Sequence, residues 1–455
     1  MLKRKIYRRL LEWKERDHKS LLITGQRQIG KTYIIDAFAK AEYEHYVYIN
    51  FSDSPEMSEL FSGNNCAEEL IKRLTLYFGT DSIVDGSTLL FLDEIQDCLP
   101  AYSSLKQFTI YGKIDVIASG SLLGVKMPSR DDERRILVPM GYEEQIVMYQ
   151  LDFEEYLWAK GISADTIDTI RKDIKARIPI DDIIFKRISK LFREYLIVGG
   201  MPEAVDRFIT TNDFRPVTAV HKELLNSCLR DINRYNRGSD IIRTTECFDS
   251  IPYQLADTNK KFMFSRIKGE GTRRSTDRYM EILLWIKNSG YGNFCYGLSQ
   301  PCAPLKKNVK RDLFKVYLSD TGMLLQMYGD KARLAVYNGD SSYNMGAVIE
   351  NAVANNLVKC GIEPMYYRKD KNEGRMELDF VTEFWDGVAV LEVKSGSDTK
   401  ARSLDAVKRH FDVSRLIMFE KGNISVDEKG VEHYPLFASA FIDEMNQEPE
   451  GPIFS

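Results

Sequence analysis

The segment that most constrains the fold reads GQRQIGKT, from Gly25 to Thr32. It fits the pattern G-x-x-x-x-G-K-[ST] and follows the apolar run at 21–23, so we expect it to join a buried strand to a helix. Its glycines let the backbone curl so that successive N–H groups point at a phosphate, and the helix adds its positive end. The segment therefore predicts a phosphate-binding loop.

The loop residues have expected roles at ATP. Lys31 would reach the β- and γ-phosphates, and the Thr32 hydroxyl would bind Mg²⁺. The alternative is a glycine turn with a surface lysine, which the strand before it and the helical spacing of 33–38 disfavour. The residues predicted to bind nucleotide here are Gly25, Gln26, Arg27, Gln28, Ile29, Gly30, Lys31 and Thr32.

A second acidic strand is predicted where LLFLDE ends in Asp93 and Glu94. Asp93 would lie at the carboxyl edge of the sheet and help to hold Mg²⁺, and Glu94 would orient the attacking water. In isolation the same pattern is a strand that ends in solvated acids. With Lys31 as the third catalytic residue, the pair indicates an ATPase.

A third strand, 115–118, runs into Ser119. This hydroxyl either senses the γ-phosphate or belongs to an ordinary turn. The alternation of strands and helices from residue 21 to 117 predicts a parallel, doubly wound α/β sheet.

Composition limits where this chain works and what it binds. Its 455 residues are 44% apolar, and its seven Cys form no C-x-x-C pair, so neither disulfides nor a zinc site is indicated. No apolar run reaches the length of a membrane span. We expect a soluble, cytoplasmic protein with no membrane partner. Because the net charge is −4, any nucleic-acid site must be local.

The motifs GQRQIGKT, LLFLDEIQ, VIASGSLLG, LDFEEYLWA and YLIVGGMPEAV together resemble a prokaryotic family of AAA-type ATPases. These carry a C-terminal domain of unknown function related to restriction-endonuclease folds. The resemblance implies that Gln28, Lys31, Thr32, Asp93 and Glu94 lie in the nucleotide site, and that 151–205 is a helical lid. It also implies an arginine that assists hydrolysis, from this or a neighbouring protomer of a possible homo-oligomer. The candidates are Arg134, Arg135 and Arg193.

The middle of the chain is predicted to hold a winged helix. Helical spacing at 241–256 and 274–287 is followed by a short β segment at 291–296, and the same stretch resembles the family's winged-helix part. The predicted domains are a P-loop AAA-type core at 1–150, a helical lid at 151–212, a winged helix at 213–315, an α/β restriction-endonuclease-like domain at 316–443 and a tail at 444–455.

Charge favours a DNA contact in that stretch. From Asp257 to Lys315 there are thirteen Lys or Arg against five Asp or Glu, opposite in sign to the whole chain. Such contacts give affinity that depends steeply on salt but little sequence preference. Arg273, Arg274 and Arg278, at the start of the predicted recognition helix, are the predicted contacts. The alternative is a solvated face or a protein-packing module.

Carboxylates recur near the end of the chain. The predicted strands 377–381 and 390–394 and the helix 346–358 carry Glu350, Asp379, Glu392 and Lys394, which resemble the PD-(D/E)xK nuclease constellation. The three acids would bind Mg²⁺, and Lys394 would stabilise charge or activate water. Many nuclease-like folds persist as binding scaffolds, so cleavage does not follow from the pattern.

Three functions remain open from the sequence. The first is a Mg²⁺-dependent ATPase that binds DNA through the winged helix and processes it with the last domain. The second is an ATP-switched DNA- or protein-binding regulator with a catalytically silent nuclease-like scaffold. The third is a remodeller of proteins only, which the basic stretch disfavours.

Overall fold

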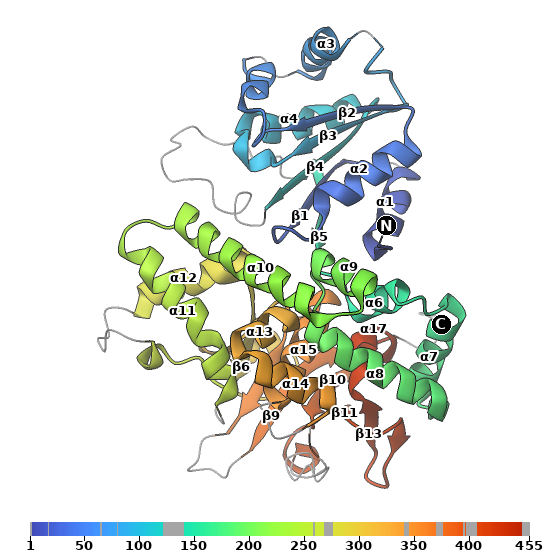
Figure 1. The fold of residues 1–455 in the computed structure, drawn as a ribbon, viewed down its shortest axis with the longest axis vertical. Helices are drawn as coiled ribbons and strands as arrows, with labels where there is room; N and C mark the ends of the chain where they lie inside the picture. The colour runs from blue at the N-terminus through green and yellow to red at the C-terminus, as the bar shows by residue number, and fades with distance from the viewer. Residues whose placement is uncertain are drawn as a thin grey trace. The chain divides into compact units, whose positions relative to one another are not determined.

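The computed structural model describes residues 2–16, 18–63, 66–79, 81–121, 141–257, 260–267, 276–340, 345–369, 376–394, 396 and 407–447. These residues divide into two compact units (Figure 1). The first unit holds residues 3–150 together with 288–290, and the second holds the remainder from Leu151 onward. Each unit is described by itself.

The first unit is built on a five-stranded sheet in the order β2-β3-β4-β1-β5. All four strand pairs are parallel, which confirms the predicted parallel α/β sheet. Since parallel strands share one carboxyl edge, the loops after β1, β3 and β4 meet there. The strands are β1 (Ser20–Gly25), β2 (His45–Asn50), β3 (Thr88–Asp93), β4 (Asp115–Ser121) and β5 (Glu143–Met148).

Helices cover both faces of this sheet. Alternate strand residues such as Leu22, Leu90 and Val116 form one core with α3 and α4, whereas α2 packs on β1, β3 and β4 through side chains outside that core. The helices are α1 (Lys5–Lys14), α2 (Lys31–Glu42), α3 (Ala67–Phe78) and α4 (Leu99–Tyr111), with 3₁₀ turns η1 (Pro55–Phe61) and η2 (Ile95–Asp97).

The second unit combines many helices with one large sheet. Its helices are α6 (Phe153–Ala159), α7 (Ala164–Ala176), α8 (Asp182–Val198), α9 (Pro202–Thr211), α10 (Phe214–Tyr235), α11 (Ser239–Ala256), α12 (Thr276–Asn288), α13 (Thr321–Tyr328), α14 (Asp330–Asn338), α15 (Met345–Lys359) and α17 (Ile442–Met445), with 3₁₀ turns η3 (Phe264–Arg266), η5 (Leu305–Asn308) and η7 (Leu436–Phe441). None of these described helices, nor those of the first unit, combines the length and apolarity that a bilayer crossing requires.

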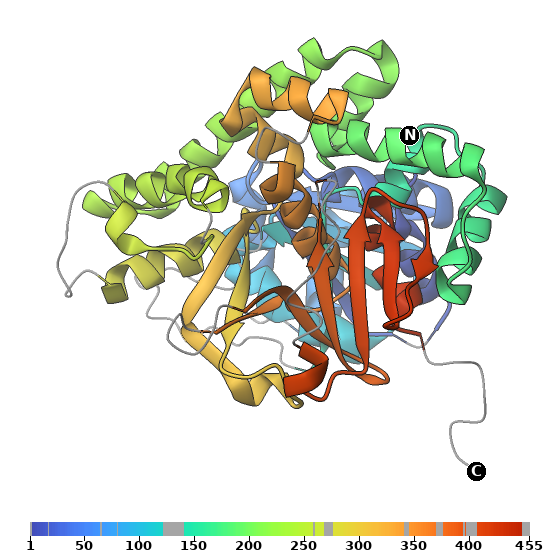
Figure 2. The same ribbon diagram turned by 90° about the horizontal axis from the view of Figure 1, so that it is seen from below.

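The sheet has eight strands in the order β12-β13-β11-β10-β9-β8-β6-β7 and mixes parallel with antiparallel pairs. Figure 2 shows it from the yellow strands β6 and β7 to the red β13. The strands are β6 (Gly292–Leu298), β7 (Val309–Leu318), β8 (Met365–Arg368), β9 (Glu377–Phe384), β10 (Gly387–Val393), β11 (Arg415–Glu420), β12 (Ser425–Val426) and β13 (Val431–Pro435). α15 packs against β6, β7 and β10.

The pairing in this sheet contradicts one part of the predicted winged helix, the wing. The segment at 291–296 is not a separate wing, because β6 pairs with β7 on one side and with β8 on the other. The predicted boundary at 315/316 falls inside β7. The predicted helices 241–256, 274–287 and 346–358 correspond to α11, α12 and α15.

The turn Gly199-Gly200 between α8 and α9 is held by a carboxylate. Asp320 accepts hydrogen bonds from Gly200 N at 2.7 Å and from Met323 N at 2.9 Å, the latter at the start of α13. Gly199 has φ +72°, and a Cβ there would lie 2.3 Å from Asp320 Oδ1. The glycine therefore lets one carboxylate join α8, α9 and α13.

Gly199→Ala is expected to lower the free energy of unfolding of the second unit by about 2 to 3 kcal/mol, since strained backbone and a steric clash combine. Urea unfolding of the full chain measures this. Gly161→Ala is the matched control, because φ is +74° there and nothing lies within 4 Å of the added Cβ. It should cost only about 1 kcal/mol. Equal costs at the two sites would show that Asp320 does not require a glycine.

Candidate nucleotide site and carboxylate cluster

The loop Gly25–Thr32 connects β1 to α2, as predicted. Gln28 has φ +63°, and Gly30, which precedes α2, has φ +86°. At Gly25 the backbone approaches β5 so closely that a Cβ would lie 2.4 Å from the Met148 carbonyl oxygen. The curled backbone thus leads directly into the positive end of a 12-residue helix.

Lys31 lies inside this loop. Its Nζ donates hydrogen bonds to the carbonyl oxygens of Gly25 at 3.1 Å and Gln26 at 2.9 Å, and the residue is only 7% exposed. Burial lowers the pKa of Lys31 to about 8, although the carboxylates of Glu94 and Asp93 oppose this shift. The ammonium is therefore held beside the acidic strand end, with its desolvation partly compensated.

The Asp93 carboxylate accepts hydrogen bonds from hydroxyl groups on three other elements. Thr32 Oγ1 donates to Asp93 Oδ2 at 2.8 Å, and Tyr48 Oη donates to the same oxygen at 3.1 Å. Ser119 Oγ donates to Asp93 Oδ1, so this hydroxyl orients the carboxylate in the observed arrangement. The order β3-β4-β1 brings Asp93, Ser119 and the loop to one edge of the sheet.

The donor set at Asp93 fits Mg²⁺. This ion takes hard oxygen ligands, retains several waters and is usually bound by one or two protein groups together with phosphate oxygens. The Thr32 hydroxyl and the Asp93 carboxylate already face each other, and Asp93 is 1% exposed. Displacing the hydrogen bond between them would free one oxygen from each for the ion.

Glu94 follows Asp93 in a left-handed backbone conformation, with φ +52°. Its carboxylate accepts a hydrogen bond from the Gln96 side chain, whose own oxygen accepts from Ser121 N at 3.3 Å. Gln96 therefore positions the predicted water-orienting carboxylate and links it to the end of β4.

Sequence reasoning missed several residues that support the loop. The Arg4 guanidinium donates to the carbonyl oxygens of Ile29 at 3.0 Å and Tyr149 at 2.7 Å. The Gln150 side chain donates to that of Gln26. Tyr48 and Gln96 were missed as well. Among these four residues, only Gln96 had a signal in the sequence, because it lies two residues after Glu94. The others come from elements distant in sequence.

The cations of the basic stretch 257–315 lie in different environments in the structure. Arg273 and Arg274 lie outside the described residues, and Arg278 lies in α12, where its side chain is not described. Lys260 and Arg266 are engaged by Glu350 and Asp257, and Lys315 is fully buried. Four cations are exposed and form no hydrogen bond or ion pair through their side chains with described residues. They are Lys306, Lys307, Lys310 and Arg311, on η5 and β7.

The four predicted nuclease-like residues come from adjacent elements. Asp379 on β9 and Glu392 on β10 are connected through the backbone: Val393 N donates to Asp379 Oδ2 at 3.0 Å and Asp379 N donates to Glu392 Oε1 at 3.4 Å. Lys394 Nζ lies 3.2 Å from Glu392 Oε2. Glu350, on α15, is 3% exposed and accepts from Tyr317 Oη at 3.3 Å.

Two lysines outside the predicted set neutralise this cluster. Lys260 forms an ion pair with Glu350. Lys315, fully buried on β7, lies 3.5 Å from Glu377 Oε1 and over the ring of Tyr366. Burial alone would lower the pKa of Lys315, but the carboxylates of Glu350, Asp379 and Glu377 outweigh burial and raise that pKa.

The electrostatics of the acids follow from these lysines. Burial would raise the pKa of Glu350, but Lys260 and Lys315 hold it below the ordinary value. Burial, together with the charge of Glu350, raises the pKa of Asp379. Burial and the charge of Asp379 raise the pKa of Glu392. The cluster is therefore close to charge balance without a metal.

The cluster does not fit the predicted metal site. Within the described parts of the chain, no three or more His, Cys, Asp or Glu side chains are grouped to hold a metal ion. The physical reason is that Glu350 pairs with Lys260 and Tyr317, and Glu392 pairs with Lys394. Lys315, on β7, adds a buried positive charge. The four predicted residues do lie together, but as an ion-pair network.

The arginine candidates stay predictions. Arg134 and Arg135 lie outside the described residues. Arg193 lies on α8, where it lines a pocket of the second unit.

A glycine-rich loop between a parallel strand and a helix, with a lysine inside it and a buried aspartate beside it, defines a P-loop domain. Residues 17–157 match the protein-family model described as an AAA domain. This match supports the resemblance to AAA-type ATPases for that part of the chain. Residues 189–334 match a domain of unknown function (DUF8612), and residues 345–437 match another (DUF4143).

Among solved structures, the chain is similar to the Walker-type ATPase PABY2304 of Pyrococcus abyssi, at 14% identity and a TM-score of 0.42, covering 72% of this chain and 96% of that one. It is also similar to the Aeropyrum pernix ORC2 protein in its ADPNP-ADP complexes, at 14% identity and a TM-score of 0.35, covering 75% and 92%. A third similar structure is that of AMPPCP-bound DnaA from Aquifex aeolicus, at 13% identity and a TM-score of 0.29, covering 62% of this chain and 87% of that one. No curated protein matches the chain.

Proposed function

We propose that the chain binds ATP with Mg²⁺ at Gly25–Thr32 and hydrolyses it. The observation that carries this proposal is the hydrogen bond between Thr32 Oγ1 and Asp93 Oδ2, at 2.8 Å, beside a loop that encloses Lys31. It joins the loop to the acidic strand in the arrangement that nucleotide binding requires.

Each protein group has a role in this reaction. Loop N–H groups and the start of α2 bind the phosphates, and Lys31 exchanges the carbonyls of Gly25 and Gln26 for phosphate oxygens. Mg²⁺, when bound, neutralises charge on the β- and γ-phosphates, and Thr32 and Asp93 would hold it. Glu94 orients the attacking water, and Gln96 holds the Glu94 carboxylate in place.

Thr32→Val should remove most of the contribution of Mg²⁺ to ATP affinity, about tenfold, because a metal-binding hydroxyl is lost. Titrating a fluorescent ATP analogue with and without Mg²⁺ measures this. Thr32→Ser retains the hydroxyl and is the control, which should behave like the wild type. If the wild type does not bind the analogue with Mg²⁺ present, the proposal is wrong.

For a second function, DNA binding, we propose contacts from Lys306, Lys307, Lys310 and Arg311, here called the basic strip. Four exposed cations without described partners can replace the counterions of a phosphate backbone. β7 is the terminal strand of its sheet, and lysines on such strands also prevent unwanted strand pairing. That alternative predicts no DNA affinity.

The basic strip should appear in the salt dependence of binding. Lys306→Gln with Lys310→Gln is expected to reduce the slope of log K against log salt concentration by about 1.8, at about 0.9 per phosphate contact. Fluorescence anisotropy with a labelled duplex measures it. The double variant Lys186→Gln with Lys190→Gln, on exposed positions of α8, is the charge-matched control. Equal slopes for both double variants would show that the basic strip does not contact DNA.

For the carboxylate cluster we propose that it belongs to a catalytically silent nuclease-like scaffold and does not cleave nucleic acid. Lys260 and Lys315 supply the positive charge that a metal would supply, so the cluster requires no metal ion. A nicking assay with Mg²⁺ or Mn²⁺ on the wild type, Asp379→Ala and Lys394→Ala tests this. The three proteins should behave alike. Nicking by the wild type that both substitutions abolish would establish the nuclease instead.

A further inference from the structure

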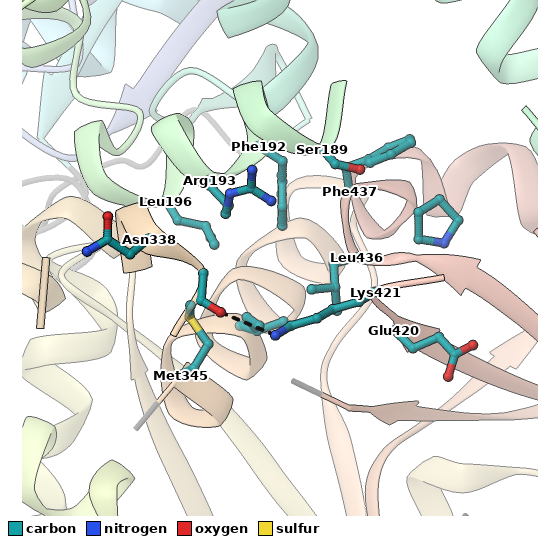
Figure 3. A pocket seen from close by; sticks show the side chains of 13 residues that line it. Ser189, Phe192, Arg193, Leu196, Asn338, Met345, Glu420, Lys421, Leu436 and Phe437 are labelled. Atoms are coloured by element: carbon teal, nitrogen blue, oxygen red, sulfur yellow. Dashed lines mark hydrogen bonds between the residues drawn. The ribbon is translucent and has the colours of Figure 1, made fainter. Parts of the chain in front are cut away.

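A pocket of about 300 Å³ lies within the second unit, separate from the carboxylate cluster. Figure 3 shows its walls: α8 above, the end of α14 and the start of α15 on one side, and the end of β11 with η7 on the other. Its volume is at the lower end of pockets that accept small organic ligands.

Most of the pocket wall is apolar. Phe192 and Leu196 project from α8, Met345 and Ile349 from α15, and Phe437 from η7. All five side chains belong to the buried core, so the walls are fixed by packing. An apolar body of a ligand would gain free energy by leaving water for this surface.

Two cations face this apolar surface from opposite walls. Arg193, on α8, is half-buried and makes no hydrogen bond or ion pair with any described residue. Lys421, after β11, is exposed, and among the described residues its one hydrogen-bond partner is the Gly339 carbonyl oxygen at 3.4 Å (Figure 3). Among the described lining residues the one carboxylate is that of Glu420, which is 3.2 Å from His433 Nδ1, and Figure 3 shows it directed away from the two cations.

We propose that this pocket binds a small organic monoanion: a carboxylate on an apolar, ring-sized body. The carboxylate lies between Arg193 and Lys421, and the body lies against Phe192, Leu196 and Met345. The guanidinium offers a planar pair of donors that matches a carboxylate, and Lys421 adds a second charge-assisted hydrogen bond.

A monoanion fits better than a phosphate dianion. The end of α14 at Asn338 and the start of α15 at Met345 place end charges of opposite sign at the same rim, so the helices add little net charge. The lining therefore carries two positive charges against the one of Glu420. Because the net charge of the lining is a single positive charge, a second negative charge on the ligand would be desolvated against apolar walls without a compensating charge.

The test is isothermal titration calorimetry of the full chain with 2-naphthoate. The uncharged 2-naphthalenemethanol is titrated in parallel, and 2-naphthoate is titrated again in the presence of inorganic phosphate. We expect 2-naphthoate to bind with one-to-one stoichiometry, the alcohol to bind at least tenfold more weakly, and phosphate not to compete. Arg193→Gln and Lys421→Gln should each weaken 2-naphthoate about tenfold, the loss expected for one charge-assisted hydrogen bond.

Lys190→Gln, an exposed position of the same helix, is the matched control and should leave the affinity unchanged. Met345→Trp, which fills the pocket without altering its charge, should abolish binding. Thermal unfolding of each variant identifies any that fail to fold. The proposal is overturned if the wild type does not bind 2-naphthoate, if the alcohol binds equally well, if phosphate displaces it, or if the folded charge variants retain full affinity.

Discussion

Lys31→Ala is expected to lower the rate of ATP hydrolysis by about 100-fold or more, because it removes a preorganised cation from the site where phosphate charge develops. The ammonium is held inside the loop by the carbonyl groups of Gly25 and Gln26, so binding ATP requires only an exchange of partners. Phosphate release from ATP under saturating Mg²⁺ measures the loss.

Two further variants make this result specific. Lys40→Ala, on an exposed turn of the same helix, removes an equal charge whose one ion-pair partner among the described residues is Asp36, and should leave the rate within about twofold. Glu94→Gln should keep ATP affinity but lose turnover, since it removes the carboxylate and not the phosphate contacts. If Lys31→Ala retains the wild-type rate, hydrolysis does not occur at this loop.

The arrangement of the candidate nucleotide site could be predicted from sequence because its parts are local. The loop, the strand ending in Asp93 and the small residues at the end of β4 each form a short pattern, and a parallel sheet brings such strand ends to one edge. Tyr48 and Arg4 were not predictable in this way. Their contacts depend on β2 lying beside β3 and on the chain before α1 reaching the loop, which no local pattern encodes.

The second unit was predicted less well because its sheet is non-local. The β6 strand reads as a wing in sequence, yet its neighbours are β7 and β8, and β8 lies about 70 residues further along the chain. The helix α10 was not predicted at all, although it spans 22 residues. The sequence count treats the cations near Lys315 as one basic surface, whereas β7 is exposed at Lys310 and buried from Phe314 onward, so that Lys315 lies in the core.

Lys315→Met is expected to lower the free energy of unfolding of the second unit by about 3 kcal/mol near neutral pH, because it leaves buried carboxylates without their cation. Lys315 is fully buried and lies 3.5 Å from Glu377, and its charge also stabilises the ionised forms of Glu350 and Asp379. Methionine has a similar length and keeps the packing over Tyr366, so the loss reports mainly on charge.

The same variant tests what the cluster can bind. If the lysines replace a metal, millimolar Mn²⁺ should not raise the melting temperature of the second unit in the wild type, but should restore part of the stability of Lys315→Met. Lys310→Met, on the exposed part of β7, is the control and should change stability by less than about 0.5 kcal/mol. Stabilisation of the wild type by Mn²⁺, lost in Asp379→Ala, would instead show that the acids bind a metal beside Lys315.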